Sequence, residues 1–385
     1  MTATPIPIML LVSSLEHGGA ERQVVELANH LDRARFDPTL CSLSELVPLA
    51  EHLRERERVL RIVPKQSRFD RGVIGKVAGM MKERGTRLVH NFLFDAEMVG
   101  RLAARRAGVA AVVASERNTD YRRPWSHWLG QHLTRGLFDL MVANSESGKR
   151  FNIRTLGLKP ERIHVVRNGV DTDRFHPLDK RTVRAALGLP HEVPIVGMVA
   201  SFKRQKNHAD YFRLARGVLA RFPAAQFLCV GEPLRDNLQG AQDYHFEMHA
   251  LLDELRLGEH FVFLGARQDM PEIYNACDLT VLTSAREGTP NVLLESLACG
   301  VPVVATDVSD NAQVVPQGQV GFVVALHDVS ALTDRVCELL GDSGRRAALG
   351  VAARDWAQTE FSIPKMVERM QGVYEGVLRS KGLIA

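Results

Sequence analysis

The segment 278–306 places a short helical stretch between two apolar strands, a unit that is typical of parallel sheets. Thr289 is expected as the N-cap of that helix and Pro290 as its first residue, because the missing proline N–H would be unpaired there anyway. The helix is expected to reach about Ala298 and to stop at Gly300. Its first N–H groups and the positive end of its dipole predict a site for an anion such as a phosphate.

Two glutamates flank this predicted anion site. Glu287 lies in the loop before the helix, and Glu295 lies within the helix, eight positions later. One interpretation is that they hold the two ends of a phosphorylated, hydroxyl-rich molecule. Paired carboxylates also serve glycosidases as acid and nucleophile, and glutamates near a helix start are often ordinary solvated residues. The order strand, turn, helix, strand favours the first interpretation.

Apolar strands alternate with helical patterns along the whole chain. In the first part the strands are expected at 6–13, 39–43, 58–62, 88–91, 111–115, 140–143 and 163–166, and in the second part at 195–200, 226–230, 262–264, 279–282, 301–305 and 321–324. Helices are expected, among others, at 20–31, 95–107, 125–138, 181–187, 208–221, 247–255 and 270–275. This alternation predicts an α/β fold built on doubly wound parallel sheets.

With 385 residues the chain is too long for one ordinary core, so two domains are expected. The segment 167–177 is dense in turn residues, which is typical of a linker. The predicted parts are a Rossmann-like domain at 1–175, a second one at 176–360 and a final amphipathic helix within 361–385. Two such domains that face each other across a cleft bind ligands at the carboxyl ends of their strands.

Composition and charge limit where the protein is located in the cell and what it binds. No apolar run is long enough to span a bilayer, no cleavable signal pattern opens the chain, and five cysteines are scattered without metal spacing. These features predict a cytoplasmic protein with buried thiols. Residues 1–170 carry 27 Lys and Arg against 18 Asp and Glu (+9), and the remainder carries 22 against 27 (−5). The basic part indicates either a solvated arginine-rich face or contact with an anionic acceptor or membrane, at the inner face of the plasma membrane. Nucleic acid is not expected, because no binding motif is present.

Two groups of residues directly follow predicted strands. Gly18 and Gly19 come after the first strand and open a helix, which allows close backbone approach to a ligand, although such a pair is also a common turn. Lys203, Arg204 and Lys206 follow the strand at 195–200. Cations there can stabilise a departing pyrophosphate, or they belong to an ordinary basic surface loop. Their position after the end of a predicted strand favours a role in ligand binding over an ordinary surface loop, for Lys206 above all.

The run from Glu287 to Glu295, followed by Ala-Cys-Gly-Val-Pro-Val-Val-Ala-Thr306, resembles the E-x7-E signature of retaining glycosyltransferases of family four, which have the GT-B fold. Further motifs similar to that family are found along nearly the whole chain, at Gly18–Glu21, Asn144–Glu146, Asn168–Asp171 with Phe175, Val230–Glu232, Phe263–Gly265 and Phe361–Ser362. The resemblance implies two Rossmann-like domains, with the C-terminal helix crossing back to the first.

The resemblance also implies roles for individual residues. Glu295 would bind the ribose hydroxyls of a nucleotide sugar, Glu287 would lie beside the donor sugar, and Lys206 would neutralise the diphosphate while Gly19 approaches it. The backbone near the phosphates would come from Gly288, Thr289, Pro290 and Asn291. Transfer would keep the anomeric configuration by front-face attack, without a protein nucleophile. No metal or other cofactor is expected, because the only Asp-x-Asp spelling, 171–173, lies in the linker.

Two positions depart from the family pattern. Ser201 stands where the family usually has an arginine, whose charge Lys203 or Arg204 is available to replace. The histidine that often follows the fourth strand is missing, and residues 115–118 stand in its place. Sugar or acceptor contacts are expected there and at the next strand end, from Arg117, Asn118 and Asn144.

The resulting hypothesis is a glycosyltransferase that moves a hexose from a UDP- or GDP-sugar to a glycan or a polyprenyl-linked acceptor, in cell-surface polysaccharide synthesis. Two alternatives remain open. A nucleotide-sugar 2-epimerase has the same architecture and needs no acceptor, and a non-catalytic partner subunit would keep the fold without turnover.

Overall fold

The computed structural model describes residues 4–16, 18–67, 70–117, 124–231 and 239–384. The chain forms two compact units. Unit 1 comprises residues 1–169 and 363–385, and unit 2 comprises residues 170–362. Each unit is built on one sheet in which every strand pairing is parallel. The predicted alternation of strands and helices is confirmed.

The seven-stranded sheet of unit 1 has the order β3-β2-β1-β4-β5-β6-β7. Its strands are β1 (Ile6–Val12), β2 (Phe36–Ser42), β3 (Leu60–Ile62), β4 (Leu88–Phe92), β5 (Ala111–Glu116), β6 (Leu140–Ala143) and β7 (Ile163–Val165). Its helices are α1 (Gly19–His30), α2 (Arg56–Val59), α3 (Gly72–Glu83), α4 (Phe94–Ala107), α5 (Trp125–Thr134), α6 (Glu146–Leu156) and α15 (Ile363–Ser380).

The six-stranded sheet of unit 2 has the order β10-β9-β8-β11-β12-β13. Its strands are β8 (Ile195–Val199), β9 (Gln226–Val230), β10 (Phe261–Gly265), β11 (Leu279–Leu282), β12 (Val303–Thr306) and β13 (Gly321–Val324). Its helices are α7 (Lys180–Ala186), α8 (His208–Leu219), α9 (Gln239–Glu254), α10 (Met270–Ala276), α11 (Asn291–Ala298), α12 (Asn311–Val314), α13 (Val329–Gly341) and α14 (Ser343–Glu360).

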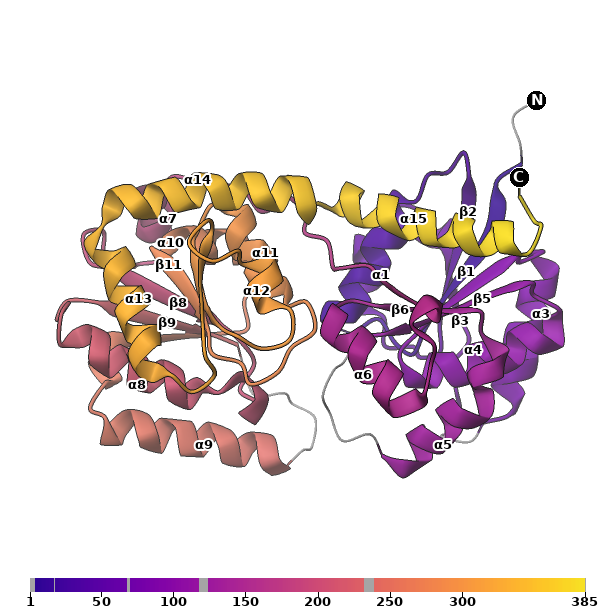
Figure 1. Ribbon diagram of the computed structural model, residues 1–385, viewed down its shortest axis with the longest axis horizontal. Helices are drawn as coiled ribbons and strands as arrows, with labels where there is room; N and C mark the ends of the chain where they lie inside the picture. Colours follow the sequence, from indigo (N-terminus) through magenta and orange to yellow (C-terminus); the bar gives the residue numbers. More distant parts are fainter. Residues whose placement is uncertain (1–3, 17, 68–69, 118–123, 232–238, 385) are drawn as a thin grey trace. The chain divides into compact units, whose positions relative to one another are not determined.

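Strand β1 shows why helices cover both faces of the unit 1 sheet. Its side chains alternate, so Ile8, Leu10 and Val12 join the core beneath α1 and α15, and Met9 and Leu11 join the core beneath α3 and α4. A strand buried on both faces must be apolar at every position, and β1 is. Figure 1 shows α15 beside α1, over one face of this sheet.

Backbone pairing decides where unit 2 begins. The Val170 N–H donates to the Phe361 carbonyl at 2.7 Å, and Val170 forms an isolated parallel bridge with Ser362. Residues from 170 onward are thereby tied to the end of unit 2. The division falls after Gly169 instead of after the predicted residue 175, and α15 is part of unit 1.

Local boundaries differ from the sequence expectation at a few places. Residues 58 and 59, expected as strand, form the last turn of α2, so β3 begins at Leu60. Strand β12 begins at Val303 instead of Val301, directly after Pro302, whose nitrogen has no hydrogen to donate to a ladder. Helix α9 begins eight residues before the expected 247, at Gln239. All five cysteines are buried, as predicted.

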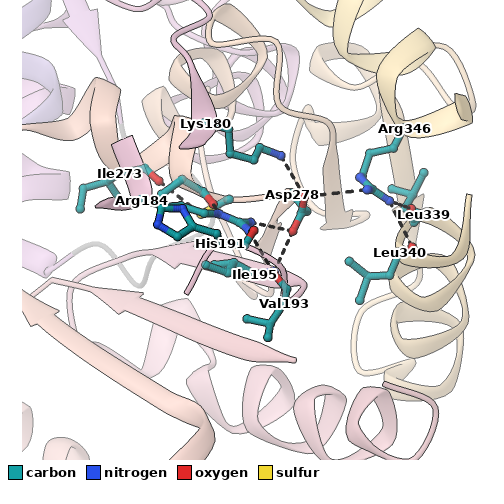
Figure 2. Close-up of polar contacts among 12 residues, drawn as sticks. Lys180, Arg184, His191, Val193, Ile195, Ile273, Asp278, Leu339, Leu340 and Arg346 are labelled. Carbon is teal, nitrogen blue, oxygen red and sulfur yellow. Dashed lines mark hydrogen bonds and ion pairs between the residues drawn. The ribbon is translucent and has the colours of Figure 1, made fainter. Parts of the chain in front are cut away.

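The amino end of β11 is held by a carboxylate among three cations (Figure 2). One oxygen of Asp278 accepts from the Lys180 ammonium at 2.9 Å, and the other accepts from the Arg184 guanidinium and the Ile195 N–H, each at 2.8 Å. Arg346 lies 3.8 Å away. Asp278 therefore joins α7 and α14 to the adjacent ends of β8 and β11.

Burial disfavours the ionised form of Asp278, and its hydrogen-bond and ion-pair partners favour it. Desolvation raises the pKa of the carboxyl, but Lys180, the Ile195 N–H and Arg184 together outweigh it, and the net pKa lies below the ordinary value. The remaining donors of Arg184 reach three backbone carbonyls, those of Ala276, His191 and Val193.

Replacing Asp278 by Asn should destabilise unit 2 by about 3 kcal/mol at neutral pH, because the buried Arg184 guanidinium loses its counter-charge. A carboxyl with a lowered folded pKa stabilises the fold above its unfolded pKa of about 3.9, and this contribution is lost as the pH falls through the folded value. The difference between wild type and variant should therefore shrink below about pH 4. Urea unfolding followed by hydrogen exchange in unit 2 peptides measures it. The exposed Asp253→Asn is the control, and an equal loss there would contradict the assignment.

Candidate functional site

The strand order of unit 2 places β8 and β11 side by side, although they are far apart in sequence. Connections run outward from this pair in both directions, toward β10 on one side and β13 on the other. In open α/β sheets such a switch point leaves a crevice at the carboxyl ends of the two strands, where ligands bind. The loops that follow β8 and β11 contain the predicted cations and Glu287.

An ion pair joins these two loops. The Lys206 ammonium lies 2.5 Å from a carboxylate oxygen of Glu287, and Glu287 is only 8% exposed. The loops are also joined through Gln205, whose carbonyl accepts from the Ala285 N–H and whose side-chain amide donates to the Arg286 carbonyl, both at 2.8 Å. The structure thus brings together two residues that the sequence places 81 positions apart.

Two hydroxyl side chains fix the backbone around this pair. Thr283 Oγ1 donates to the carbonyls of Lys206 and Asn207, at 3.0 and 2.9 Å. The Ser309 hydroxyl accepts from the Glu287 N–H at 3.1 Å and also contacts the Glu287 carbonyl. Ser309 adopts a left-handed conformation, with φ of 55°, which serine rarely does. Backbone strain at this point is consistent with a functional loop.

Helix α11 begins one residue later than predicted. Pro290 has extended dihedral angles, φ −74° and ψ 119°, so it is the N-cap, and Asn291 is the first helical residue. The expectation of Thr289 as N-cap is wrong for this reason. Within the described contacts, no side chain caps the helix. The helix ends at Ala298 and Gly300 follows with φ of 69°, as predicted.

Glu295 lies one turn into α11 and is 7% exposed. The Tyr274 hydroxyl, from α10, donates to one of its oxygens at 2.8 Å. This bond holds the carboxylate in place. Glu287, Gly288, Thr289, Pro290 and Asn291 are consecutive, so the loop, the helix start and Glu295 belong to one continuous and mostly buried segment of the chain.

The three cations after β8 have different surroundings. Desolvation and then the neighbouring Lys206 lower the pKa of the Lys203 ammonium, while Glu287 partly offsets them. Lys203 thus belongs to the electrostatic neighbourhood of the ion pair, although the residue is exposed. Arg204 is directed elsewhere, since its guanidinium pairs with Glu247 of α9 at 2.5 Å. Ser201 is half-buried at the start of the loop.

Gly231, which follows β9, packs closely against the backbone at the start of the loop that contains Lys203 and Lys206. It has φ of 137°, and a Cβ on it would lie 2.3 Å from the Ala200 carbonyl oxygen. Only glycine allows the end of β9 to approach the backbone at the start of the lysine-bearing loop. Glu232, the next residue of the predicted motif, lies outside the described residues.

In unit 1 the corresponding switch point lies between β1 and β4. Gly18 is the N-cap of α1, and the Glu21 carboxylate folds over it so closely that a Cβ on Gly18 would lie 2.0 Å from its oxygen. Gly19 is exposed at the first position of the helix. Burial raises the pKa of Glu21, although its own backbone N–H and Arg117 act in the opposite direction.

Arg117 is a nearly buried cation, 9% exposed, at the end of β5. It donates to the Asn168 side chain at 2.7 Å and lies over the Phe92 ring, 5.4 Å from its centroid. Burial lowers its pKa to about 10. The amide of Asn144 donates to the Arg117 carbonyl at 3.4 Å, so these two predicted contact residues are neighbours. Asn118 lies outside the described residues.

Three residues of these regions were not predicted from the sequence. Tyr274 and Ser309 reach the glutamates from other elements, so no local pattern indicates them. Leu93 follows β4 with φ of 68°, a strained conformation for a bulky residue, at the unit 1 switch point. Backbone strain of this kind has no signature in a single sequence.

Comparison with known proteins identifies the family. Residues 179–356 match the model of "Glycosyl transferases group 1", and residues 17–174 match that of "Glycosyltransferase Family 4". The chain belongs to this glycosyltransferase family. A D-inositol 3-phosphate glycosyltransferase of Nocardia farcinica is 32% identical over 71% of this chain, and one of Mycobacterium tuberculosis is 29% identical over 77%. The chain covers 64% of the length of each of these relatives.

Solved structures confirm the GT-B fold class. Anabaena Alr3699/HepE in complex with UDP superimposes with a TM-score of 0.84 at 22% identity, over 96% of this chain and 100% of that one. A glycosyltransferase from Rickettsia africae superimposes with a TM-score of 0.83 at 19% identity, over 97% of this chain and 99% of that one. Sucrose-phosphate synthase from Thermosynechococcus elongatus superimposes with a TM-score of 0.78 at 21% identity, over 97% of this chain and 100% of that one.

The described residues contain no group of three or more His, Cys, Asp or Glu side chains placed to hold a metal ion. Nor does any helix in these parts of the chain have the length and apolar character needed to cross a bilayer. The absence of a metal requirement stays a prediction.

Because Lys206 and Glu287 act in opposite directions on the pKa of Lys203, replacing each of them should shift that pKa in opposite directions. Glu287→Gln should lower the pKa of Lys203 further, because the attractive carboxylate is lost, and Lys206→Met should raise it, because a repelling cation is lost. Acetylation of Lys203 as a function of pH, followed by mass spectrometry, measures both. Lys203 profiles that do not move in either variant would contradict the proposed neighbourhood.

Proposed function

We propose that this chain is a retaining glycosyltransferase that moves a hexose from a nucleoside-diphosphate sugar, a UDP-sugar in the first place and a GDP-sugar otherwise, to a glycan or polyprenyl-linked acceptor. The observation that carries this proposal is the Lys206–Glu287 ion pair at the switch point of unit 2, next to the start of α11. The family of the chain supports it, and so do relatives solved with UDP and with UDP-glucose.

The site has what departure of a nucleoside diphosphate requires. Negative charge develops on the leaving phosphate, and Lys206 and the positive end of α11 are placed to stabilise it. In this proposal the Glu287 carboxylate, which contacts the Lys206 ammonium, orients it and meets hydroxyls of the donor sugar. Glu295, held by Tyr274, supplies an acceptor for the two ribose hydroxyls. Arg204, bound to Glu247, would have to leave that partner to take part.

The chemistry that we propose is the one that the family resemblance implies. The acceptor oxygen attacks the anomeric carbon from the side on which the phosphate departs. The bond between the anomeric carbon and the phosphate oxygen breaks, and the departing phosphate takes the acceptor's proton. No protein nucleophile and no metal are needed for this step. The role in cell-surface polysaccharide synthesis, with a cytoplasmic location, is proposed from the family resemblance. The net positive charge of unit 1 supports contact with an anionic acceptor or membrane.

Donor binding can be measured without knowing the acceptor. A panel of nucleotide sugars should contain one that raises the melting temperature, since a ligand at 100 times its Kd adds about 2.7 kcal/mol of stability. Slow release of nucleoside diphosphate from the same donor is expected. A panel in which nothing binds or turns over would refute the proposal, and a product with an epimerised sugar would identify a 2-epimerase instead.

Glu295→Ala should weaken donor binding by about 1.5–3 kcal/mol, the cost of losing hydrogen bonds to a charged group. Tyr274→Phe should weaken it by about 1 kcal/mol, because the carboxylate stays but loses the hydrogen bond from the Tyr274 hydroxyl. Calorimetry with UDP, the free nucleoside and the sugar 1-phosphate shows whether the loss follows the ribose. Glu254→Gln, an exposed change on α9, is the control. Equal affinity in Glu295→Ala and wild type would remove Glu295 from the site.

The expected independence of metal is tested by chelation. Transfer and donor hydrolysis should be unchanged after dialysis against EDTA, because Lys206 and the start of α11 supply the positive charge. A rate that falls on chelation and returns with Mg²⁺ or Mn²⁺ would contradict this prediction.

A further inference from the structure

Helix α5 of unit 1 has its polar side chains inside and its apolar side chains outside. On the inner face, Gln131 and Thr134 accept hydrogen bonds from the Arg101 guanidinium of α4, at 2.7 and 2.9 Å. Arg101 is fully buried and also pairs with Glu97 at 2.9 Å. The buried ion pair therefore requires polar partners from α5, and this fixes which face of the helix turns inward.

The outer face carries the apolar residues. Trp125 is 77% exposed, Trp128 44%, Leu129 39% and Leu133 75%. Their spacing of three, four and eight positions places them along one stripe of the helix. His132 lies on the same stripe and stacks on Trp128, with ring centroids 4.0 Å apart. Leu102 of α4, which packs against α5, is also exposed, at 38%.

We call Trp125, Trp128, Leu129, Leu133 and Leu102 the α5 stripe. A helix that covers a globular core normally turns its apolar stripe toward that core. A cluster of exposed apolar side chains marks a surface that meets another apolar phase. Four of its members, two tryptophans and two leucines, lie within the ten residues of α5, the composition of helices that lie in a membrane interface.

Charge around the α5 stripe points to one kind of partner. Arg105 and Arg106 follow Leu102 by one turn on the exposed face of α4, and Arg135 directly follows α5. Unit 1 carries 31 Lys and Arg against 20 Asp and Glu, a net charge of +11, whereas unit 2 carries 18 against 25, a net charge of −7. A second copy of this face would bring like charges together, but an anionic surface would neutralise them.

We infer that the α5 stripe docks unit 1 on membranes that contain anionic lipids, with the tryptophans and leucines in the interface and the arginines at the headgroups. The inference goes beyond the proposed sugar transfer and specifies the membrane contact proposed for unit 1. It is independent of the donor site, because vesicle binding is measured without any sugar nucleotide.

The test uses the full chain and vesicles of equal parts phosphatidylglycerol and phosphatidylcholine. Wild type should co-sediment with these vesicles at low salt, and much less with pure phosphatidylcholine. The variant Trp125→Ser/Leu133→Ser should lose at least about tenfold in partitioning, because burial of these side chains drives insertion. Val351→Ser, a similarly exposed apolar residue on α14 at 75%, is the matched control and should bind as wild type does.

A second readout shows which residues enter the membrane. The chain has three tryptophans, and Trp356 donates its indole N–H to the Val314 carbonyl within unit 2. A blue shift of fluorescence on adding vesicles, quenched by brominated lipid, should disappear in Trp125→Phe/Trp128→Phe and remain in Trp356→Phe. The Arg105→Gln/Arg106→Gln variant should lose the preference for phosphatidylglycerol.

Three outcomes would overturn the inference. The first is equal vesicle binding by wild type and Trp125→Ser/Leu133→Ser when both have the same melting temperature. The second is binding without preference for anionic lipid. The third is a wild-type dimer in sedimentation velocity that the double variant dissociates while vesicles are not bound, since a second copy would then cover the α5 stripe.

Discussion

The adjacency of β8 and β11 is the constraint on which the candidate donor site depends. Polar contacts fix this strand pair at both ends. At the amino end, Asp278 binds Arg184 and the Ile195 N–H, and at the carboxyl end Lys206 binds Glu287. Between them the strands supply an apolar, doubly covered platform. Because the loops extend from a pair that is held at both ends, a shift of one loop relative to the other requires breaking the part-buried Lys206–Glu287 ion pair.

Local charge and overall charge have opposite signs in unit 2. The unit as a whole is negative, yet Lys203, Lys206 and the start of α11 gather positive potential around one carboxylate, Glu287. At physiological ionic strength, charges more than about 8 Å away across solvent are largely screened. An anionic ligand at this crevice therefore responds to the neighbouring ammonium groups more than to the acidic surface. The acidic remainder disfavours anions elsewhere on the unit, which helps to confine them to the site.

Much of the fold could be predicted because its patterns are local. Strands buried on both faces are apolar throughout, and the turn around Pro290 separates a strand from a helix. The position of Glu287 and Glu295 around a helix start follows from that order alone. Other features depend on contacts between distant elements. Tyr274 lies on a different helix from Glu295, and nothing in the spacing of α5 shows that Arg101 selects which side of it is buried. Arg204 has a local position equivalent to that of Lys206, and only the placement of α9 decides that it binds Glu247.

The pairing of Val170 with Phe361 and Ser362 has a consequence for the order in which the protein is made. Unit 2 is an insertion within unit 1, and its two ends are hydrogen-bonded to each other. A ribosome therefore synthesises all of unit 2 before it synthesises α15. The face of unit 1 that α15 covers, where His90 contacts Tyr374 of that helix, stays uncovered during that time. Unit 2 is continuous in sequence and can fold as one piece, whereas unit 1 is complete only when its two separate segments meet.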